Sequence, residues 1–304
     1  MRLYFIIFFV LVGLAEAQNL QPYILVLGVA QDGGYPHLGC EKECCKKAWE
    51  DDSLKKNVVS LAIVHPVLKK WWMLEATPDI NKQLHLFQEL TQHQYNYLPE
   101  GIFITHAHIG HYSVLMQLGR EVMNAKEIPV TVLPKMKKYL ENNGPWSQLV
   151  NLKNISLFQL DTNKTLMLFP DLEITAFTVP HRDEFSETAG FKIKAGLKTY
   201  LFIADIDKWQ KWNKNIVEEV KKCDAAFVDA TFYSMDELKG RKMEEVPHPL
   251  VNETIELFSK DKAEVKSKIV FIHFNHTNKI MFDKQIRESV EQKGFRVAEQ
   301  GRGY

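Results

Sequence analysis

The chain has 304 residues, of which 45% are hydrophobic, 25% are charged and 11% are aromatic. These proportions are typical of a globular protein and exclude a disordered, collagen-like or coiled-coil chain. The 38 basic residues balance the 38 acidic residues, and a chain without excess positive charge is a poor candidate for binding nucleic acid. The length allows one large α/β domain or two small domains.

The first 17 residues have the form of a secretory signal peptide. Arg2 precedes an apolar run at positions 3–15, and the small-x-small sequence Ala15-Glu16-Ala17 follows as a cleavage site. The run is shorter than the roughly 20 apolar residues that span a bilayer. A membrane anchor or a buried first strand is the alternative. We expect cleavage near Ala17, a secreted or periplasmic location, and a mature single domain at 18–304 without stable membrane association.

Short apolar runs rich in β-branched and aromatic residues predict strands. In chain order they cover residues 23–29, 58–64, 71–74, 101–105, 130–133, 172–179, 199–204, 225–228 and 268–274. Helical periodicity predicts helices at residues 80–90, 113–124, 134–142, 208–222, 250–259 and 284–293. Strands dominate the first half and alternate with helices in the second. This pattern predicts the α/β class, with two mixed sheets between layers of helices in an αββα four-layer sandwich.

Side chains of metal-binding type follow several predicted strands. His106, His108 and His111 come directly after the strand at 101–105. Asp205 follows the strand at 199–204, and His273 lies near the end of the strand at 268–274. Ligand sites gather at strand ends, so we expect these groups to converge. His106 and His108 are two residues apart and point the same way in an extended segment, as two ligands of one ion would. A chance cluster of surface histidines is the alternative.

The segment His106-x-His108-x-Gly110-His111 resembles the His-x-His-x-Asp-His signature of the metallo-β-lactamase superfamily. Three further residues match later motifs of that superfamily in the expected order: His181, Asp205 and His273. The resemblance covers nearly the whole mature chain. It implies one or two metal ions bound by six residues: His106, His108, His111, His181, Asp205 and His273. In this scheme Asp205 bridges the two metal positions.

Within the superfamily the chain is similar to the branch that contains pyrroloquinoline-quinone biosynthesis protein B and the phosphonate-pathway cyclic phosphodiesterase. Four segments carry this similarity: the glycine-rich stretch at 27–36 and residues 76–79, 229–232 and 273–278. The first of these two families has largely lost the paired histidines, whereas this chain keeps them. The difference favours a hydrolytic, metal-loaded site over a pure role in cofactor biosynthesis.

Gly110 departs from the superfamily pattern, because an aspartate that binds the second metal ion usually stands there. Glycine offers no side-chain ligand, so the second position keeps only His111, Asp205 and His273. We therefore expect one tightly held ion and a second that is weak, absent or of another element. Zinc is the expected metal, and the same ligands would suit iron or manganese. Asp32 in the glycine-rich loop could reach the site, although nothing in the sequence requires it.

These residues predict a hydrolase that uses metal-bound hydroxide, because a divalent ion lowers the pKa of water towards about 7. Asp205 would accept the proton of the water or bridge two ions. His248 would stabilise the leaving group, with capping of the helix at 250–259 as the alternative role. Asp229 could orient a histidine or cap a turn. The expected partner is a small molecule, either a phosphodiester or a similar ester. Iron-dependent redox chemistry, as in quinone-cofactor maturation, and a non-catalytic metal- or cofactor-binding protein remain open, as does the oligomeric state.

Cys40, Cys44 and Cys45 form a cluster within six residues. Vicinal cysteines form a disulfide only with strain, and a thiolate zinc site needs a fourth ligand. In the phosphodiesterase family a cysteine-rich loop binds structural zinc together with a histidine three residues after the last catalytic histidine, and this position is His276 here. The resemblance thus implies a structural zinc site formed by Cys40, Cys44, Cys45 and His276. Lys42 stands where the family has its middle cysteine, so a disulfide or a degenerate site remains an alternative.

Overall fold

The computed structural model describes residues 20–238, 242 and 246–304, so the predicted signal peptide lies outside the described residues. The first sheet has six strands in chain order: β1 (Tyr23–Gly28), β2 (Ser60–His65), β3 (Lys70–Leu74), β4 (Ile102–Phe103), β5 (Ile128–Val132) and β6 (Ile155–Gln159). Strands β1 to β3 pair antiparallel, and β3 to β6 pair parallel.

The second sheet has seven strands. Its spatial order is β13 (Arg296–Val297), β12 (Ile269–Ile272), β11 (Ala225–Asp229), β10 (Lys198–Ile203), β9 (Thr188–Ala195), β8 (Leu172–Val179) and β7 (Thr165–Phe169). Strands β10 to β13 are parallel, and β7 to β10 are antiparallel. Both sheets are therefore mixed, as predicted.

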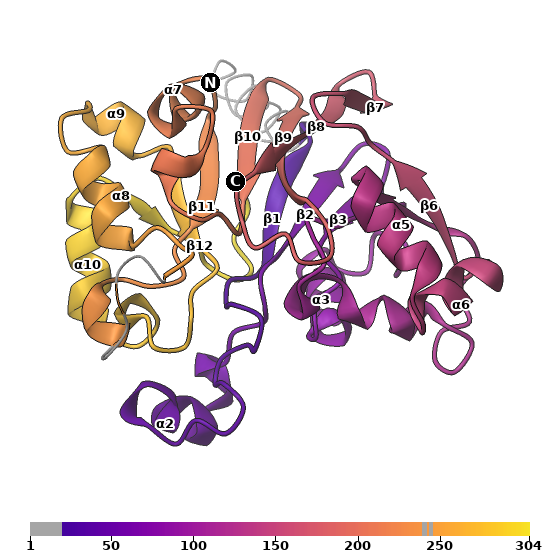
Figure 1. Ribbon diagram of the computed structural model, residues 1–304, viewed down its shortest axis with the longest axis horizontal. Helices are drawn as coiled ribbons and strands as arrows, with labels where there is room; N and C mark the ends of the chain where they lie inside the picture. Colours follow the sequence, from indigo (N-terminus) through magenta and orange to yellow (C-terminus); the bar gives the residue numbers. More distant parts are fainter. Residues whose placement is uncertain (1–19, 239–241, 243–245) are drawn as a thin grey trace, which may run out of the picture.

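Helices cover the outer faces of the two sheets (Figure 1). On the side of the first sheet lie α3 (Ile80–Leu90), α5 (Pro134–Asn142) and α6 (Trp146–Asn151). On the side of the second sheet lie α7 (Ile216–Lys221), α8 (Val251–Leu257), α9 (Ala263–Lys266) and α10 (Lys284–Gln292). The short helix α2 (Glu43–Glu50) projects below the sandwich. This arrangement confirms the predicted αββα architecture.

Alternation along the strands explains why the first sheet is apolar on both faces. In β1, Val26 belongs to the core between the sheets, whereas Leu25 faces the helices on the outer side. In β2, Ile63 likewise belongs to the core between the sheets, whereas Val64 faces the outer helices. Side chains of successive strand residues point to opposite faces, so both faces must be apolar where both are covered. Each fully buried aliphatic side chain stabilises the fold by about 1.5–3 kcal/mol.

Several predicted elements occur at the predicted bounds, namely α3, α5 and β8. Two helix predictions were wrong. Residues 113–124 contain only a 3-10 turn, Ser113–Leu118, which follows the one-turn helix α4 (Ile109–Tyr112). Residues 208–222 divide into a 3-10 turn, Trp209–Lys211, and the separate helix α7. Four strands were not predicted: β6, β7, β9 and β13. Strand β9 contains a glycine and two lysines, and its pairing with β8 and β10 determines its conformation.

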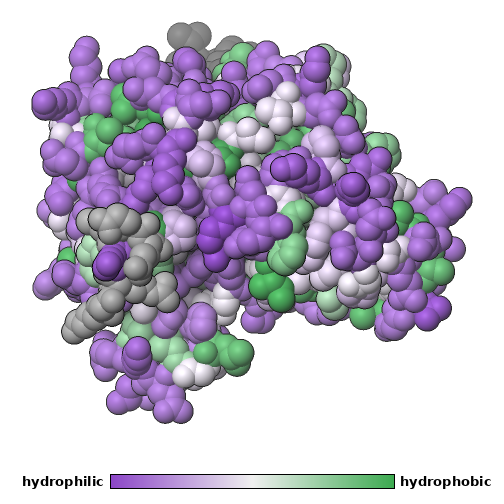
Figure 2. All heavy atoms as spheres, viewed as in Figure 1, coloured by the Kyte–Doolittle hydropathy of each residue, from purple (hydrophilic) through white to green (hydrophobic). Residues whose placement is uncertain are grey.

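Figure 2 shows a mainly hydrophilic surface on which hydrophobic residues lie in scattered patches. Within the described part of the chain, every helix is too short or too polar to cross a membrane.

Candidate metal centre

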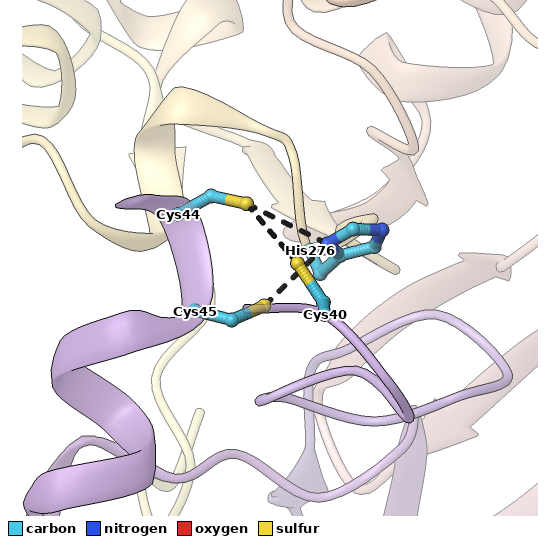
Figure 3. Close-up of side chains that lie close together, drawn as sticks. All are labelled: Cys40, Cys44, Cys45 and His276. Atoms are coloured by element: carbon cyan, nitrogen blue, oxygen red, sulfur yellow. Dashed lines mark hydrogen bonds between the residues drawn. The ribbon is translucent and has the colours of Figure 1, made fainter. Parts of the chain in front are cut away.

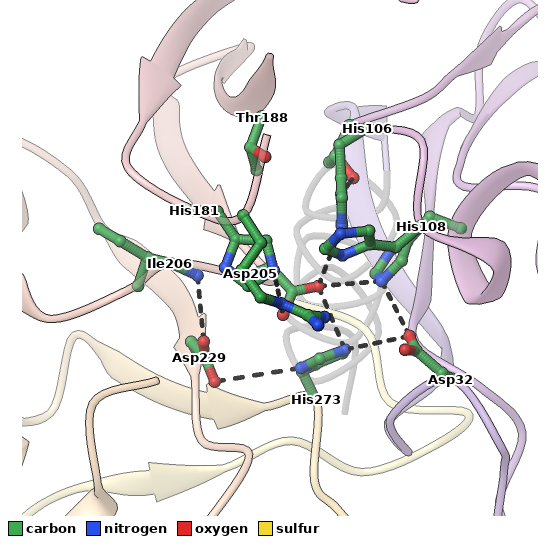
Figure 4. Close-up of polar contacts among 12 residues, drawn as sticks. Asp32, His106, His108, His181, Thr188, Asp205, Ile206, Asp229 and His273 are labelled. Carbon is green, nitrogen blue, oxygen red and sulfur yellow. Dashed lines mark hydrogen bonds and ion pairs between the residues drawn. The ribbon is translucent and has the colours of Figure 1, made fainter. Parts of the chain in front are cut away.

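The six predicted metal ligands come together at one edge of the two sheets. Figure 4 shows His106, His108, His181, Asp205 and His273 close together. Each follows the end of a strand or lies on the turn of helix after it, and the strands concerned are β4, β8, β10 and β12. His106, His108 and His111 come from the first sheet, whereas His181 and Asp205 come from the second. The long-range convergence expected at strand ends is therefore present.

The carboxylate of Asp205 lies at the centre of the group. Its Oδ2 atom is 2.9 Å from His111 Nε2 and 3.4 Å from His273 Nε2. The same oxygen is 3.7 Å from His106 Nε2, while Oδ1 is 3.8 Å from His181 Nε2. These five side chains are at most 4% exposed. The two oxygens thus face different histidines, which is the arrangement of a bridging carboxylate.

The Nε2 atoms of these four histidines have no hydrogen-bond partner among the described residues. They lie close to carboxylate oxygens, but without the orientation that a hydrogen bond requires. A buried polar atom left without a partner costs about 1–3 kcal/mol. Bound metal ions would satisfy these atoms, so the donor set fits a metal centre.

The other ring nitrogen of each of these histidines faces an oxygen of a neighbouring side chain. The Nδ1–oxygen pairs are His106–Thr105 at 2.8 Å, His111–Glu75 at 3.3 Å, His181–Asp207 at 3.4 Å and His273–Thr231 at 3.0 Å. The contacts of His106 and His273 are hydrogen bonds, which fix the orientation of an imidazole whose other nitrogen binds a metal, whereas the contacts of His111 and His181 lack hydrogen-bond geometry. His108 differs, because its Nε2 is 2.9 Å from Glu184 Oε2, which leaves Nδ1 as the atom available to an ion.

Burial and neighbouring groups set the charges of the centre. Burial, reinforced by the neighbouring His111, holds the pKa of His106 well below its usual range. Burial opposes ionisation of Asp205, but His273 and His111 outweigh it and keep the pKa of this carboxyl well below its usual range. Burial also lowers the pKa of His111, yet Glu75 and Asp205 outweigh it and raise that pKa well above the usual range. The centre therefore combines the neutral imidazole of His106 with the ionised carboxylate of Asp205, which are forms that bind metals, whereas His111 must release a proton when an ion binds.

Asp32 corrects the expectation that only three residues remain at the second metal position. Its Oδ1 atom is 3.1 Å from His111 Nε2 and 3.8 Å from His273 Nε2. Burial raises the pKa of Asp32, but the two neighbouring imidazoles outweigh this and lower it well below its usual range. Asp32 therefore offers a fourth ligand, an ionised carboxylate, beside His111, His273 and Asp205.

Sequence reasoning also missed Glu75, which is fully buried behind His111. A signal was present, because Glu75 is a charged residue that directly follows the apolar strand β3. Glu75 and His273 both adopt positive φ angles, of 73° and 67°. Non-glycine residues in this region carry backbone strain, and such residues cluster at functional sites.

His248 lies inside the centre and does not cap the helix that follows it. Its Nδ1 is 2.8 Å from Asp229 Oδ2 and 3.5 Å from Asp205 Oδ1. Leu250 N, just before α8, donates to Glu253 Oε2 at 2.9 Å, and the first two N–H groups of α8 donate to Phe232 O and Tyr233 O at 2.9 and 3.2 Å. Asp229 therefore has both roles considered for it, because it orients His248 and its Oδ1 also caps the following turn by accepting from Thr231 N at 2.9 Å.

The cysteine cluster forms a second group of metal-binding side chains (Figure 3). Cys40 Sγ and Cys44 Sγ are 3.6 Å apart, and His276 Nδ1 is 3.7 Å from Cys44 Sγ and 3.5 Å from Cys45 Sγ. Zinc–sulfur bonds of about 2.3 Å give a tetrahedron with edges of roughly 3.8 Å, whereas a disulfide brings sulfurs to about 2.05 Å. The geometry thus fits a tetrahedral ion. Burial and His37 lower the pKa of His276 to about 4, so its imidazole is neutral at physiological pH.

The comparisons with known proteins agree with this fold. The family described as Beta-lactamase superfamily domain matches residues 70–274. Coenzyme PQQ synthesis protein B of Methylorubrum extorquens (strain PA1) is 25% identical over 92% of this chain and 98% of that protein. The protein of the same name from Gluconobacter oxydans (strain 621H) is 27% identical over 91% of this chain and 96% of that protein.

Two solved structures share the whole architecture. Zn²⁺-bound PqqB from Methylobacterium extorquens superposes with a TM-score of 0.76 at 22% identity, over 93% of this chain and 99% of that one. A diphosphatase of the PhnP family gives a TM-score of 0.67 at 16% identity, over 93% and 96% of the two chains. The chain therefore belongs to the metallo-β-lactamase superfamily; it is similar in sequence and fold to PqqB and in fold to a diphosphatase of the PhnP family.

Proposed function

We propose that the chain is a metal-dependent hydrolase of a small phosphodiester or a similar ester. The observation that carries this proposal is the set of four buried Nε2 atoms that face Asp205 without hydrogen-bond partners among the described residues. A divalent metal ion bound there lowers the pKa of water towards about 7 and so supplies hydroxide at neutral pH.

Asp205 and His248 carry the proposed proton transfers. Asp205 is ionised at neutral pH, because His273 and His111 lower its pKa more than burial raises it. It can therefore accept a hydrogen bond from the attacking water and orient it. Because a lowered pKa makes the carboxylate a weak base, it would take the proton only from water that a bound metal ion has already acidified. Burial lowers the pKa of His248, but Asp229 outweighs it and raises that pKa above the usual value. A protonated imidazole held by Asp229 is suited to donate a proton to the leaving oxygen.

The exposure of the centre favours a small substrate. His111 and His273 are completely buried, whereas Asp32 is 31% exposed and His108 15% exposed. Solvent therefore reaches the centre from the side of Asp32 and His108. The balance of acidic and basic residues also disfavours a long polyanion as substrate.

A second candidate is an oxidative role in quinone-cofactor biosynthesis with iron at the same ligands. It is favoured by the relatives named Coenzyme PQQ synthesis protein B, which match more than nine-tenths of this chain. The imidazoles of His106 and His108 fit both candidates, because neutral imidazoles suit zinc as well as iron, so metal identity separates the two.

Elemental analysis of the purified protein and a turnover screen test the proposal. We expect zinc or manganese in the preparation and hydrolysis of at least one small phosphodiester or ester. His106→Ala should reduce turnover at least about 100-fold without a change in fold, whereas the exposed His85→Ala should match the parent. Unchanged turnover in His106→Ala would refute the proposal. Iron together with substrate-dependent oxygen consumption would favour the second candidate.

We also propose that the protein is exported. The proposal rests on the signal-peptide form of residues 1–17. Fractionation of expressing cells and N-terminal sequencing should give a secreted or periplasmic chain that begins near Gln18. A cytoplasmic chain that still begins at Met1 would contradict export.

A further inference from the structure

Gly110 and Asp32 occupy the same small region of the centre, although 78 residues separate them in the chain (110 − 32). A Cβ atom added to Gly110 would lie 2.6 Å from both Cα and Cγ of Asp32. Real Cβ atoms almost never approach other atoms below 3.0 Å. The absence of a side chain at position 110 therefore makes room for the carboxylate that arrives from the glycine-rich loop.

Asp32 stands at the distances that a metal ligand requires. Zinc bonds to nitrogen or oxygen of about 2.0–2.2 Å give a tetrahedron with edges of roughly 3.3–3.6 Å. The edges from Asp32 Oδ1 are 3.1 Å to His111 Nε2 and 3.8 Å to His273 Nε2. The edges from Asp205 Oδ2 to the same two nitrogens are 2.9 and 3.4 Å. Asp32, His111 and His273 form a group that could hold one ion, and Asp205 Oδ2 lies beside both imidazole nitrogens. These four oxygen–nitrogen distances lie within about half an ångström of tetrahedral spacing.

Three of these four atoms lack a hydrogen-bond partner among the described residues, namely Asp32 Oδ1, His111 Nε2 and His273 Nε2. Asp32 Oδ1 is buried although the rest of the side chain reaches solvent. A carboxylate whose role was only to interact with solvent would not direct this oxygen between two buried imidazoles.

The backbone holds Asp32 in this place. Phe274 N donates to Val29 O, and Gln31 N donates to Phe274 O, each at 2.8 Å. The residue before Asp32 is therefore bonded to the residue after His273. The turn then closes through Gly34 N, which donates to Gln31 O at 2.8 Å. The loop that carries Asp32 is thus attached directly to the segment that carries another ligand, and the two side chains are positioned together.

We propose that Asp32 replaces the carboxylate that is missing at position 110 and completes a second metal position with His111, His273 and the bridging Asp205. The centre then binds two ions, with His106, His108 and His181 at the other position. The inference rests on the metal-loaded centre of the proposed function, but it does not depend on hydrolytic activity.

The first test compares Asp32→Asn with Asp52→Asn, the same substitution at an exposed residue. Both proteins are loaded with Zn²⁺, dialysed and analysed for zinc per chain. Loss of an outer partner already weakens metal binding 10–100-fold, so loss of a direct ligand should weaken it at least about 100-fold. We expect one zinc ion fewer per chain in Asp32→Asn and no change in Asp52→Asn. An equal zinc content in the two variants would overturn the proposal.

The second test places a spectroscopic label at the ligand position. In Asp32→Cys loaded with Co²⁺, a thiolate bound to the ion adds a near-ultraviolet charge-transfer absorption beyond that of the parent. Asp52→Cys serves as the control and should match the parent. An Asp32→Cys spectrum identical to that of Asp52→Cys would show that residue 32 does not contact the ion.

The third test uses Gly110→Ala, a substitution that is ordinarily favourable inside a helix. Here the added Cβ must displace Asp32, so we expect the zinc content to fall as in Asp32→Asn. Gly101→Ala is the control, since its Cβ would meet no atom closer than 3.4 Å. An unchanged zinc content in Gly110→Ala would contradict the claim that a side chain at position 110 and Asp32 compete for the same space. If the variants lose zinc but the parent protein shows no turnover, only the proposed hydrolysis is refuted. If the parent hydrolyses a substrate but the variants keep their zinc, only this inference is refuted.

Discussion

The buried contact between Glu75 and His111 gives a prediction whose magnitude follows from the structure. Glu75 Oε1 is 3.3 Å from His111 Nδ1, and Oε2 accepts from Thr105 N at 3.2 Å. Glu75→Gln keeps the shape of the side chain and an oxygen for Thr105 N, but it removes the negative charge behind His111. Outer partners of this kind are worth 10–100-fold in metal affinity, or about 1.4–2.7 kcal/mol. We expect the ion bound by His111 to dissociate 10–100-fold more readily.

Competition with a chromophoric chelator measures this dissociation constant directly. Glu121→Gln is the matched control, because Glu121 is exposed and pairs only with Arg120 among the contacts described. Thermal unfolding of the metal-free proteins checks that both variants fold. If Glu75→Gln and Glu121→Gln bind metal equally well, the carboxylate behind His111 does not orient the ligand and the reasoning is refuted.

Three further predictions concern other parts of the molecule. His248→Gln should lower kcat about 10²–10⁴-fold in steady-state kinetics, while elemental analysis should show an unchanged metal content. A loss of metal in this variant would instead make His248 a metal ligand. Cys45→Ser should remove one zinc ion per chain, whereas Cys223→Ser should retain it, and equal zinc contents would exclude the proposed structural site. Burial raises the pKa of Cys223 from its ordinary value of 9.0 to about 12, so the native thiol should resist thiol reagents at pH 8 and react on unfolding. Because the pKa of Cys223 is higher in the folded than in the unfolded protein, the neutral thiol stabilises the fold fully below pH 9. This stabilisation is lost as the pH rises towards 12. Denaturant titrations should therefore show a smaller fall in unfolding free energy over this range in Cys223→Ala than in the parent.

Local sequence determined much of the fold. The alternation of apolar residues in β1 and β2, and the helical periodicity of α3 and α5, are properties of a few consecutive residues and are visible without tertiary structure. The 3-10 turn at Ser113–Leu118 was not visible in this way, because its apolar residues also fit a helix. Its conformation depends on packing against the rest of the chain.

The sequence by itself also identified the histidines and Asp205 as candidate ligands. His106, His108 and His111 follow one predicted strand, and His181, Asp205 and His273 match motifs in a fixed order. Only the tertiary structure decided what surrounds them. Gly110 reads in the sequence as a lost ligand, and the folded chain brings Asp32 into the space that the glycine leaves. Glu75, which follows β3, likewise reaches His111, which lies on the helical turn after the neighbouring strand β4. Such contacts depend on the path of loops in three dimensions, and sheet pairing and packing fix that path over distances along the chain that no local pattern encodes.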